Sequence, residues 1–163
     1  METTNKLVLL GQFGVGKTSL VKRYLEDLFK TDYIPTLGVQ IKKKVLSLPE
    51  GRKVAMIIWD LEGFTSVEKI RSSYLLGSTG FLYVFDLSRP FTYENIYEDI
   101  RFLRQKYPAV SIEILGNKMD LQDPQPVLEY LAKKPLTVLG TVSAKTGEGV
   151  QEAFCEMAKI MNS

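Results

Sequence analysis

The order of hydrophobic and polar positions along the chain predicts alternating strands and helices. Residues 6–10 and 81–87 are short continuous apolar runs, which are typical of buried parallel strands. Residues 18–28 place apolar side chains three or four positions apart, which is typical of an amphipathic helix. The same reasoning predicts strands over 6–10, 39–48, 53–59, 81–87, 112–116 and 136–142, and helices over 18–28, 67–75, 94–106, 126–133 and 150–161.

One pair of strands differs from the rest. Residues 39–48 and 53–59 flank Pro49-Glu50-Gly51-Arg52, a turn sequence, so these two strands should pair antiparallel. Elsewhere strands alternate with helices, which favours parallel crossovers. The pattern therefore predicts a doubly wound α/β sheet of about six strands, mostly parallel with one antiparallel edge strand and with helices on both faces. The 163 residues fit one domain, 1–163.

Composition removes several classes of function. With 45% hydrophobic and 25% charged residues, the chain is an ordinary soluble globular protein, and its net charge of +2 gives no reason to expect a nucleic-acid partner. The single cysteine, Cys155, allows no internal disulfide, and the absence of histidine excludes His-based catalysis and His-ligated zinc. The polar start and the lack of a long apolar run favour a cytoplasmic protein.

A phosphate-binding pattern follows the first predicted strand. The pattern G-x-x-x-x-G-K-[ST] is matched by Gly11-Gln12-Phe13-Gly14-Val15-Gly16-Lys17-Thr18. In such a loop the backbone N–H groups of residues 13–18 converge on one anion at the start of a helix. Lys17 can reach the β- and γ-phosphates, and the Thr18 hydroxyl can bind Mg²⁺. A chance match in a glycine-rich turn is the alternative, and the strand–loop–helix context disfavours it.

A carboxylate comes at the end of the third predicted strand, in Asp60-Leu61-Glu62-Gly63. Beside a phosphate loop, Asp60 can hold Mg²⁺ through a water molecule, and the Gly63 N–H can approach a γ-phosphate. Taken alone, D-x-x-G is a common turn sequence. Its position after the predicted hairpin favours the functional interpretation.

Two further loops predict guanine recognition. Asn117-Lys118-Met119-Asp120 and Ser143-Ala144-Lys145 each follow a predicted strand, at the edge where doubly wound sheets bind ligands. The Asp120 carboxylate can accept hydrogen bonds from the ring N–H and the exocyclic amine of guanine, which adenine does not offer there. Turn formation alone would explain either loop, but not both together.

By these motifs and their order the chain resembles the Ras superfamily of small GTPases, and it is most similar to the Rab and Arf branches because Trp59 precedes Asp60. The resemblance implies that Thr36 binds Mg²⁺ and the γ-phosphate, and that Lys17, Thr36 and Gly63 serve hydrolysis. It also implies that Phe29 packs against the guanine. The base would further be contacted by Asn117, by the stems of Lys118 and Lys145, by Ser143 and by the backbone N–H of Ala144.

Three apolar residues have two possible interpretations. Ile41, Trp59 and Tyr74 fall where Rab-type proteins carry an apolar triad between their two switch loops. They are equally well explained as ordinary half-buried residues of strands and a short helix. The sequence leaves these two alternatives open.

Two departures from the family concern hydrolysis rather than binding. Phe64 stands where the family usually carries the glutamine that orients the attacking water, and a phenyl ring cannot do this. Phe13 replaces a small residue of the phosphate loop and is expected to shield the γ-phosphate or obstruct a partner's arginine. Replacing Phe64 with Gln, together with Phe13→Gly if Phe13 blocks the site, is therefore expected to speed hydrolysis. Glu62 near the γ-phosphate either acts on water or repels the phosphate.

The resemblance thus predicts a GTP/GDP-binding switch with slow, partner-dependent hydrolysis that uses Mg²⁺. The alternative is a GTP-binding adaptor with little or no hydrolysis, which Phe13 and Phe64 favour. An ATP-using kinase is disfavoured by the guanine loop. Protein effectors and regulators are expected at the switch loops, the protein is expected to be a monomer, and no lipid-anchor motif is expected in this chain.

Overall fold

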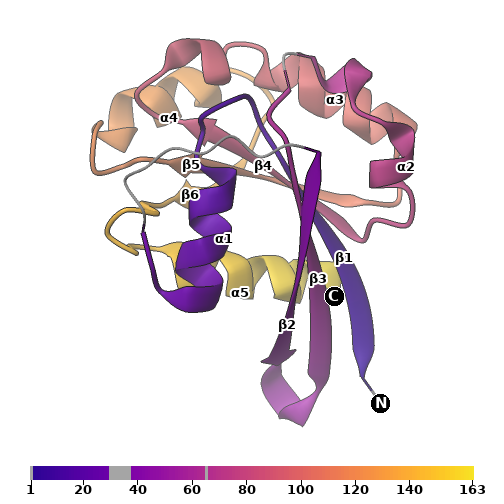
Figure 1. Cartoon of the computed structure of the whole chain (residues 1–163). Helices are drawn as coiled ribbons and strands as arrows, with labels where there is room; N and C mark the ends of the chain where they lie inside the picture. Colours follow the sequence, from indigo (N-terminus) through magenta and orange to yellow (C-terminus); the bar gives the residue numbers. More distant parts are fainter. Residues whose placement is uncertain (1, 30–37, 65) are drawn as a thin grey trace.

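The computed structural model describes residues 2–29, 38–64 and 66–163 (Figure 1). Six strands form one sheet in the order β2-β3-β1-β4-β5-β6, with β2 antiparallel to β3 and all other neighbours parallel. The strands are β1 (Thr3–Leu10), β2 (Val39–Ser47), β3 (Lys53–Leu61), β4 (Gly80–Asp86), β5 (Ser111–Asn117) and β6 (Val138–Thr141). The predicted sheet, including its antiparallel edge strand, is confirmed.

Helices cover both faces of this sheet, as predicted (Figure 1). The α-helices are α1 (Lys17–Glu26), α2 (Ser72–Leu75), α3 (Ile96–Lys106), α4 (Pro124–Ala132) and α5 (Val150–Met161). Short 3₁₀ turns lie at Pro49–Gly51, Val67–Lys69 and Pro90–Thr92. Apolar residues of α1 and α5 share one buried cluster with the sheet, whereas those of α2, α3 and α4 belong to the other.

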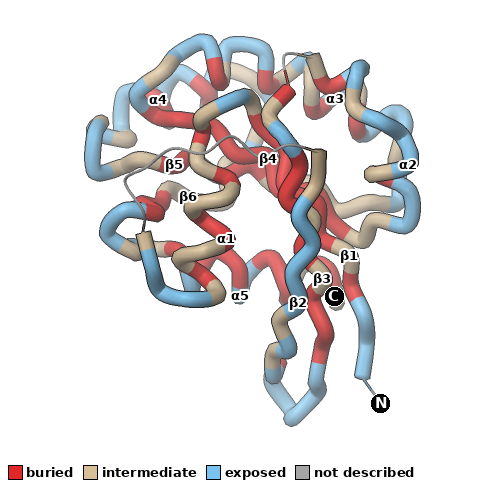
Figure 2. Tube along the Cα trace, in the orientation of Figure 1, coloured by how far each residue is buried: buried red, intermediate tan, exposed pale blue. Residues whose placement is uncertain are grey.

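The two clusters explain why the central strands are continuously apolar. Along β1, Leu7 and Leu9 face the cluster under α1 and α5, while Val8 and Leu10 face the cluster under α3 and α4. Every one of these side chains is fully buried (Figure 2). Each such side chain contributes about 1.5–3 kcal/mol by leaving water, so both faces need a cover of helices.

Most predicted boundaries differ from the structure by one to three residues, and the differences at 67–75, at the end of β3 and at the end of α1 have clear physical reasons. The segment 67–75 is not one helix, because Ile70 and Arg71 have extended ψ values of 134° and 123° that separate the 3₁₀ turn from α2. Ile70 packs against the second cluster there, and a helical period does not reveal such a break. Strand β3 runs past residue 59 to Leu61, since Asp60 and Leu61 still pair with β2.

Helix α1 ends at Glu26, two residues before the predicted end. Asp27 has a left-handed φ of 53° and donates its backbone N–H to the Arg23 carbonyl, which terminates the helix. Within the described ranges, no helix has the length and apolar character that crossing a membrane requires.

The topology fixes where a site can form. The parallel strands β1, β3, β4, β5 and β6 all run toward one edge of the sheet. The loops that follow them therefore meet at that edge, and four of these loops carry the predicted site residues.

Candidate functional site

The loop between β1 and α1 curls around the Lys17 side chain. Gly14 and Gly16 have left-handed φ values of 75° and 99°, which only glycine adopts without strain. The Lys17 ammonium donates to the carbonyls of Gly11 and Gln12 at 3.1 and 3.4 Å, and the residue is 6% exposed. Burial lowers the pKa of this ammonium to about 8, and the nearby Asp60 carboxylate opposes that shift.

Three consecutive carbonyls of this loop are held from outside by side chains. Phe13 O accepts from Arg89 Nη1 at 3.1 Å, Gly14 O from Lys118 Nζ at 2.8 Å, and Val15 O from Asn117 Nδ2 at 2.9 Å. Each partner comes from the loop after β4 or from the end of β5 and the loop after it. The phosphate loop is thus anchored to two other strand ends.

The same anchoring orients the backbone N–H groups. In a trans peptide the C=O and the following N–H point in opposite directions, so the N–H groups of Gly14, Val15 and Gly16 point away from the anchoring side chains. Val15 N–H makes a long 3.4 Å bond to Gln12 O, and those of Gly14 and Gly16 bond to no other described residue. Unpaired N–H groups at a helix start fit an anion.

A pair of oxygen donors lies beside Lys17. The Thr18 hydroxyl donates to Asp60 Oδ2 at 2.6 Å, and Asp60 is 2% exposed. The other carboxylate oxygen, Oδ1, is buried and bonds to no described residue. Burial raises the pKa of the Asp60 carboxyl, while the Thr18 hydroxyl and the Lys17 ammonium oppose the shift.

These donors fit one face of a hard divalent cation such as Mg²⁺, which prefers oxygen ligands and keeps several waters. The part of the chain that the structure describes holds no group of three or more His, Cys, Asp or Glu arranged for a metal ion. The remaining ligands would therefore come from water, nucleotide phosphate or another protein oxygen. Thr36, which the sequence predicts as a ligand, lies outside the described residues.

The loops after β5 and β6 are joined by Asn117. Its Nδ2 donates to Val15 O, and its Oδ1 accepts the Ala144 N–H at 3.1 Å. Asn117 is 1% exposed, and its two hydrogen bonds link the end of β5 to the phosphate loop and to the loop after β6. Asp120 is exposed, and its Oδ1 accepts from the Ser143 hydroxyl at 2.7 Å. Lys145 is also exposed, so Asp120 and Lys145 offer side chains at the surface of this edge.

Sequence reasoning missed two arginines that hold these loops. Arg23 of α1 donates to the carbonyls of Ala144 and Lys145, at 2.9 and 2.5 Å, and pairs with Asp27 at 2.9 Å. Arg89 contacts the phosphate loop as described above. A basic residue in the last turn of a helix is the only sequence signal for Arg23, and the sequence carries none for Arg89. Phe29 is half-buried and packs against the cluster under α1 and α5.

The segment after β3 lies directly against the phosphate loop. A Cβ atom on Gly63 would stand 2.5 Å from Phe13 Cα and 2.6 Å from Phe13 N, so only glycine fits there. Phe64 donates its backbone N–H to Gly11 O at 3.2 Å. The Phe64 ring is buried in the cluster under α3 and α4, edge-on to Tyr83 at 5.9 Å between centroids.

Comparison with known proteins agrees with this arrangement. The sequence profile of the Ras family matches residues 6–163. The chain belongs to the Ras family. Among the similar proteins, the Ras-related protein Rab-8B of Homo sapiens is 34% identical over 160 residues, covering 94% of this chain and 76% of that protein. Rab-13 of Rattus norvegicus is 33% identical over 159 residues, covering 94% and 78% respectively. As a Ras-family member, the chain is a GTP-binding switch GTPase.

The three apolar residues at the Rab-like triad positions lie together in this Ras-family protein. Ile41 of β2 pairs with Trp59 of β3, and Trp59 lies 6.4 Å from Tyr74 of α2 between ring centroids. Ile41 is 50% exposed, whereas Trp59 and Tyr74 are half-buried. Trp59 also carries the Lys6 ammonium 3.7 Å above its ring.

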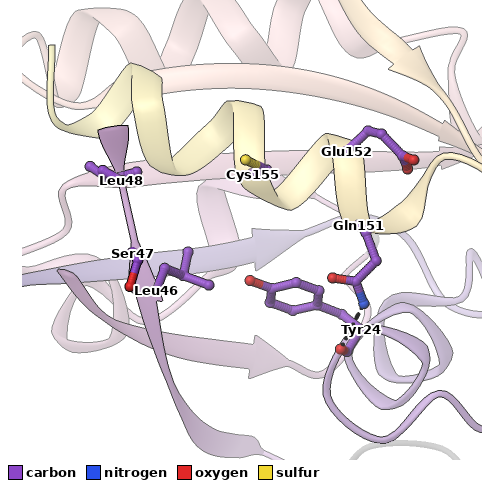
Figure 3. Close-up of a pocket in the computed structure, with 7 residues that line it drawn as sticks. All are labelled: Tyr24, Leu46, Ser47, Leu48, Gln151, Glu152 and Cys155. Carbon is purple, nitrogen blue, oxygen red and sulfur yellow. Dashed lines mark hydrogen bonds between the residues drawn. The ribbon is translucent and has the colours of Figure 1, made fainter. Parts of the chain in front are cut away.

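A cavity of about 350 Å³ lies away from the strand-end site, between α1, β2 and α5 (Figure 3). Tyr24 stacks on Phe154 at 4.2 Å, and burial raises its pKa to about 12. Its hydroxyl lines the cavity and bonds to no described residue. Cys155 and Gln151 of α5 lie on the opposite wall in Figure 3, and Gln151 donates to the Tyr24 carbonyl. None of the predicted site residues lines this cavity.

Proposed function

We propose that this Ras-family protein is a GTP/GDP-binding switch whose own GTP hydrolysis is slow and depends on a partner. The observation that carries the proposal is the contrast between two adjoining segments. The phosphate loop turns the N–H groups of residues 14–16 away from its anchoring side chains and holds the Lys17 ammonium against its own carbonyls, whereas the residue at the usual glutamine position, Phe64, is buried in the core. This contrast supports nucleotide binding by the loop and gives no side chain at position 64 that could align water.

For the phosphates, we infer that the N–H groups of residues 13–18 and the Lys17 ammonium hold the β- and γ-phosphates. Thr18 would bind Mg²⁺ directly and Asp60 would bind it through a water, as the buried, unbonded Asp60 Oδ1 supports. When bound, this ion neutralises phosphate charge. A polyphosphate beside Lys17 would add to the negative charge of Asp60 and favour the charged form of this buried ammonium.

For the base, we infer that the Asp120 carboxylate selects guanine. The Ser143 hydroxyl donates to one carboxylate oxygen of Asp120, which supports a fixed position for this side chain at the edge where Lys118 and Lys145 would flank the base. Asp120→Ala should weaken GDP binding by about 3 kcal/mol, since a charged bidentate contact is lost. Asp123→Ala is the matched control, because Asp123 is a nearby carboxylate that instead caps α4 through Gln125 N.

The test is a titration of nucleotide-free protein with GDP, GTP and ATP in the presence of Mg²⁺. We expect tight GDP and GTP binding, no comparable ATP binding, and loss of the preference in Asp120→Ala but not in Asp123→Ala. Equal affinity of the unaltered protein for ATP and GTP would contradict guanine selection.

Hydrolysis should be slow, at or below about 10⁻⁴ s⁻¹, the scale of unassisted small GTPases. The Phe64 ring offers no donor or acceptor and packs in the core, so it cannot orient a water. A single-turnover assay of the purified protein measures the rate. Fast turnover would move catalysis to the polar side chains of Gln12, Glu62 or Thr65. No turnover at all would favour the adaptor that takes up GTP without cleaving it.

Switching should involve Thr36 and Gly63, which would sense the γ-phosphate. Effectors and regulators would then bind the loops around them and the neighbouring Ile41–Trp59–Tyr74 surface. Thr36→Ala should spare GDP affinity and abolish the GTP-dependent protection of residues 32–38 from hydrogen exchange. Equal protection of the unaltered protein with GDP and with GTP would contradict a switch.

A further inference from the structure

A buried carboxylate next to the phosphate loop lies close to two cationic side chains, those of Arg89 and Lys118. Asp86, at the end of β4, is fully buried. Its Oδ1 accepts from the backbone N–H and the hydroxyl of Ser88, at 2.8 and 2.6 Å. Its Oδ2 has no well-aligned hydrogen bond and instead faces Lys118 Nζ at 2.9 Å and Arg89 Nη1 at 3.6 Å.

Each of these two cationic side chains also donates a hydrogen bond to a carbonyl of the phosphate loop. Arg89 Nη1 donates to Phe13 O at 3.1 Å, and Lys118 Nζ donates to Gly14 O at 2.8 Å. One carboxylate thus fixes two side chains, and these fix two successive peptide groups. Lys118 belongs to the guanine-binding loop, whereas Arg89 belongs to no motif found in the sequence.

We propose that Arg89 is a positioning residue for nucleotide phosphate, an inference that rests on the proposed function. By holding Phe13 O on the outside, Arg89 fixes the Phe13–Gly14 peptide plane. The Gly14 N–H, at the other end of that plane, is thereby directed away from Arg89, toward the side on which we place the nucleotide phosphate. Without Arg89 the peptide can rotate, since the two glycines at 14 and 16 leave the loop backbone permissive.

The surroundings of Arg89 are built for this contact. Its guanidinium lies 4.6 Å above the Phe91 ring, and Gln12 Nε2 donates to the Phe91 carbonyl at 3.0 Å. A Cβ atom on Gly14 would stand 2.9 Å from Arg89 Nη1, so the glycine also leaves room for the guanidinium. The 88–91 turn and the phosphate loop therefore clamp each other at two points.

A purely structural role for Arg89 makes a different prediction. If the guanidinium only balanced the charge of Asp86, its loss would lower the unfolding midpoint without changing how phosphate is held. Lys118 remains 2.9 Å from Asp86 in either case, so the carboxylate keeps one cation. If Arg89 instead positions the phosphate-binding N–H group, its loss should weaken the binding of GDP, which has a β-phosphate, and should leave the binding of GMP, which has none, unchanged.

The experiment compares Arg89→Ala, Arg89→Lys and unaltered protein in Mg²⁺ buffer. It measures the dissociation of fluorescent GDP after a chase with unlabelled GDP, the competition by GMP, and the unfolding midpoint. Arg101→Ala is the matched control, because Arg101 is exposed on α3 and has no hydrogen bond or ion pair with the described residues.

We expect Arg89→Ala to release GDP about tenfold faster, as the loss of a half-exposed, charge-assisted hydrogen bond predicts. GMP affinity should stay within about twofold, since GMP has no β-phosphate to contact Gly14. Arg89→Lys, which keeps the charge and one donor, should recover most of the retention, and Arg101→Ala should match the unaltered protein.

Two results would overturn the proposal. One is GDP release from Arg89→Ala and Arg89→Lys at the rate of the unaltered protein. The other is an equal loss of GDP and GMP affinity together with a lowered unfolding midpoint, which would assign Arg89 to the fold. If Arg89→Ala does not fold, Arg89→Met, which keeps a long side chain but has no donor for Phe13 O, is compared with Arg101→Met by the same readouts and with the same expected results. Failure of the unaltered protein to bind GDP would instead refute the proposed function.

Discussion

The phosphate loop and the segment after β3 touch each other, yet they use their side chains in opposite ways. In the loop, the Lys17 ammonium donates to two loop carbonyls, and side chains from other loops hold the backbone from outside. In the segment 60–64, Asp60 keeps a buried oxygen beside the phosphate loop that bonds to no described residue, whereas Phe64 packs into the apolar cluster beside Tyr83.

The difference separates two requirements of a GTPase. Nucleotide binding needs fixed donors, which the loop supplies with backbone N–H groups and one ammonium. Hydrolysis also needs a polar group that orients water. At position 64 the side chain is instead the apolar ring of Phe64, which is buried in the core. Under the proposed function, the chain keeps the groups that bind nucleotide and lacks a polar side chain at position 64 for hydrolysis.

The largest effect is expected when the phosphate loop loses its ammonium group, because GDP affinity then depends on the backbone N–H groups. Lys17→Met keeps the buried stem and removes the ammonium, so GDP affinity should fall by about 4 kcal/mol, as for a lost buried charged contact. Calorimetry with GDP measures the change, and Lys133→Met, an exposed lysine after α4, serves as the control. A loss below about tenfold would mean that backbone N–H groups alone hold the phosphates.

A smaller effect, on the free energy of unfolding, is expected when the buried Phe64 is replaced. Phe64→Gln buries an amide and removes the ring packed on Tyr83, which should lower the free energy of unfolding by about 3 kcal/mol. Phe64→Leu, which keeps an apolar side chain, should cost about 1 kcal/mol. Urea denaturation of the GDP-bound proteins measures both.

The same variant tests the expectation drawn from sequence alone, that a glutamine at 64 would accelerate hydrolysis. With the side chain directed into the core, the single-turnover rate should not change. A clear acceleration would show that the side chain at position 64 leaves the core when GTP is bound, and this would contradict the contrast between the two segments.

Replacing the exposed ring of the phosphate loop should have little effect on the fold. Phe13 is 47% exposed and contributes its carbonyl, not its ring, to the Arg89 contact. Phe13→Ala should therefore change the free energy of unfolding by less than about 0.5 kcal/mol and leave GDP release unchanged. Hydrolysis assisted by a regulator that supplies an arginine should rise if the ring obstructs that arginine, and an unchanged assisted rate would exclude obstruction.

The smallest effect concerns the cavity away from the site. Tyr24→Phe removes a buried hydroxyl that bonds to no described residue, so stability should stay the same or rise by up to about 1 kcal/mol. Tyr83→Phe is the control, because the Tyr83 hydroxyl donates to Asp99 at 2.5 Å and its loss should destabilise by about 1–2 kcal/mol. Thermal denaturation compares the two, and an equal loss in both would reveal a partner for Tyr24.

Periodicity alone predicted the sheet and its antiparallel edge, because strands buried on both faces must be continuously apolar and the turn at 49–52 has its own chemistry. It failed at the break near Ile70 and at the end of β3, where packing and strand pairing override local pattern. Most boundaries therefore shifted by a few residues while the order of elements held.

What the sequence by itself determined is the set of groups at the strand ends: the glycines and Lys17 of the phosphate loop, and Asp60, Asn117 and Asp120. Backbone chemistry and the parallel topology bring such groups to one edge whatever the rest of the chain does. Local sequence specifies these groups, since each lies within a few residues of its strand.

Only the tertiary structure decided how Arg23, Arg89 and Phe64 are used. Arg89 meets Phe13 across 76 positions of sequence, and Arg23 meets Ala144 across 121. A side chain gives no sign in the sequence of which distant carbonyl it reaches. Phe64 likewise follows a family motif, but the free energy gained by burying a phenyl ring against Tyr83 directs it into the core.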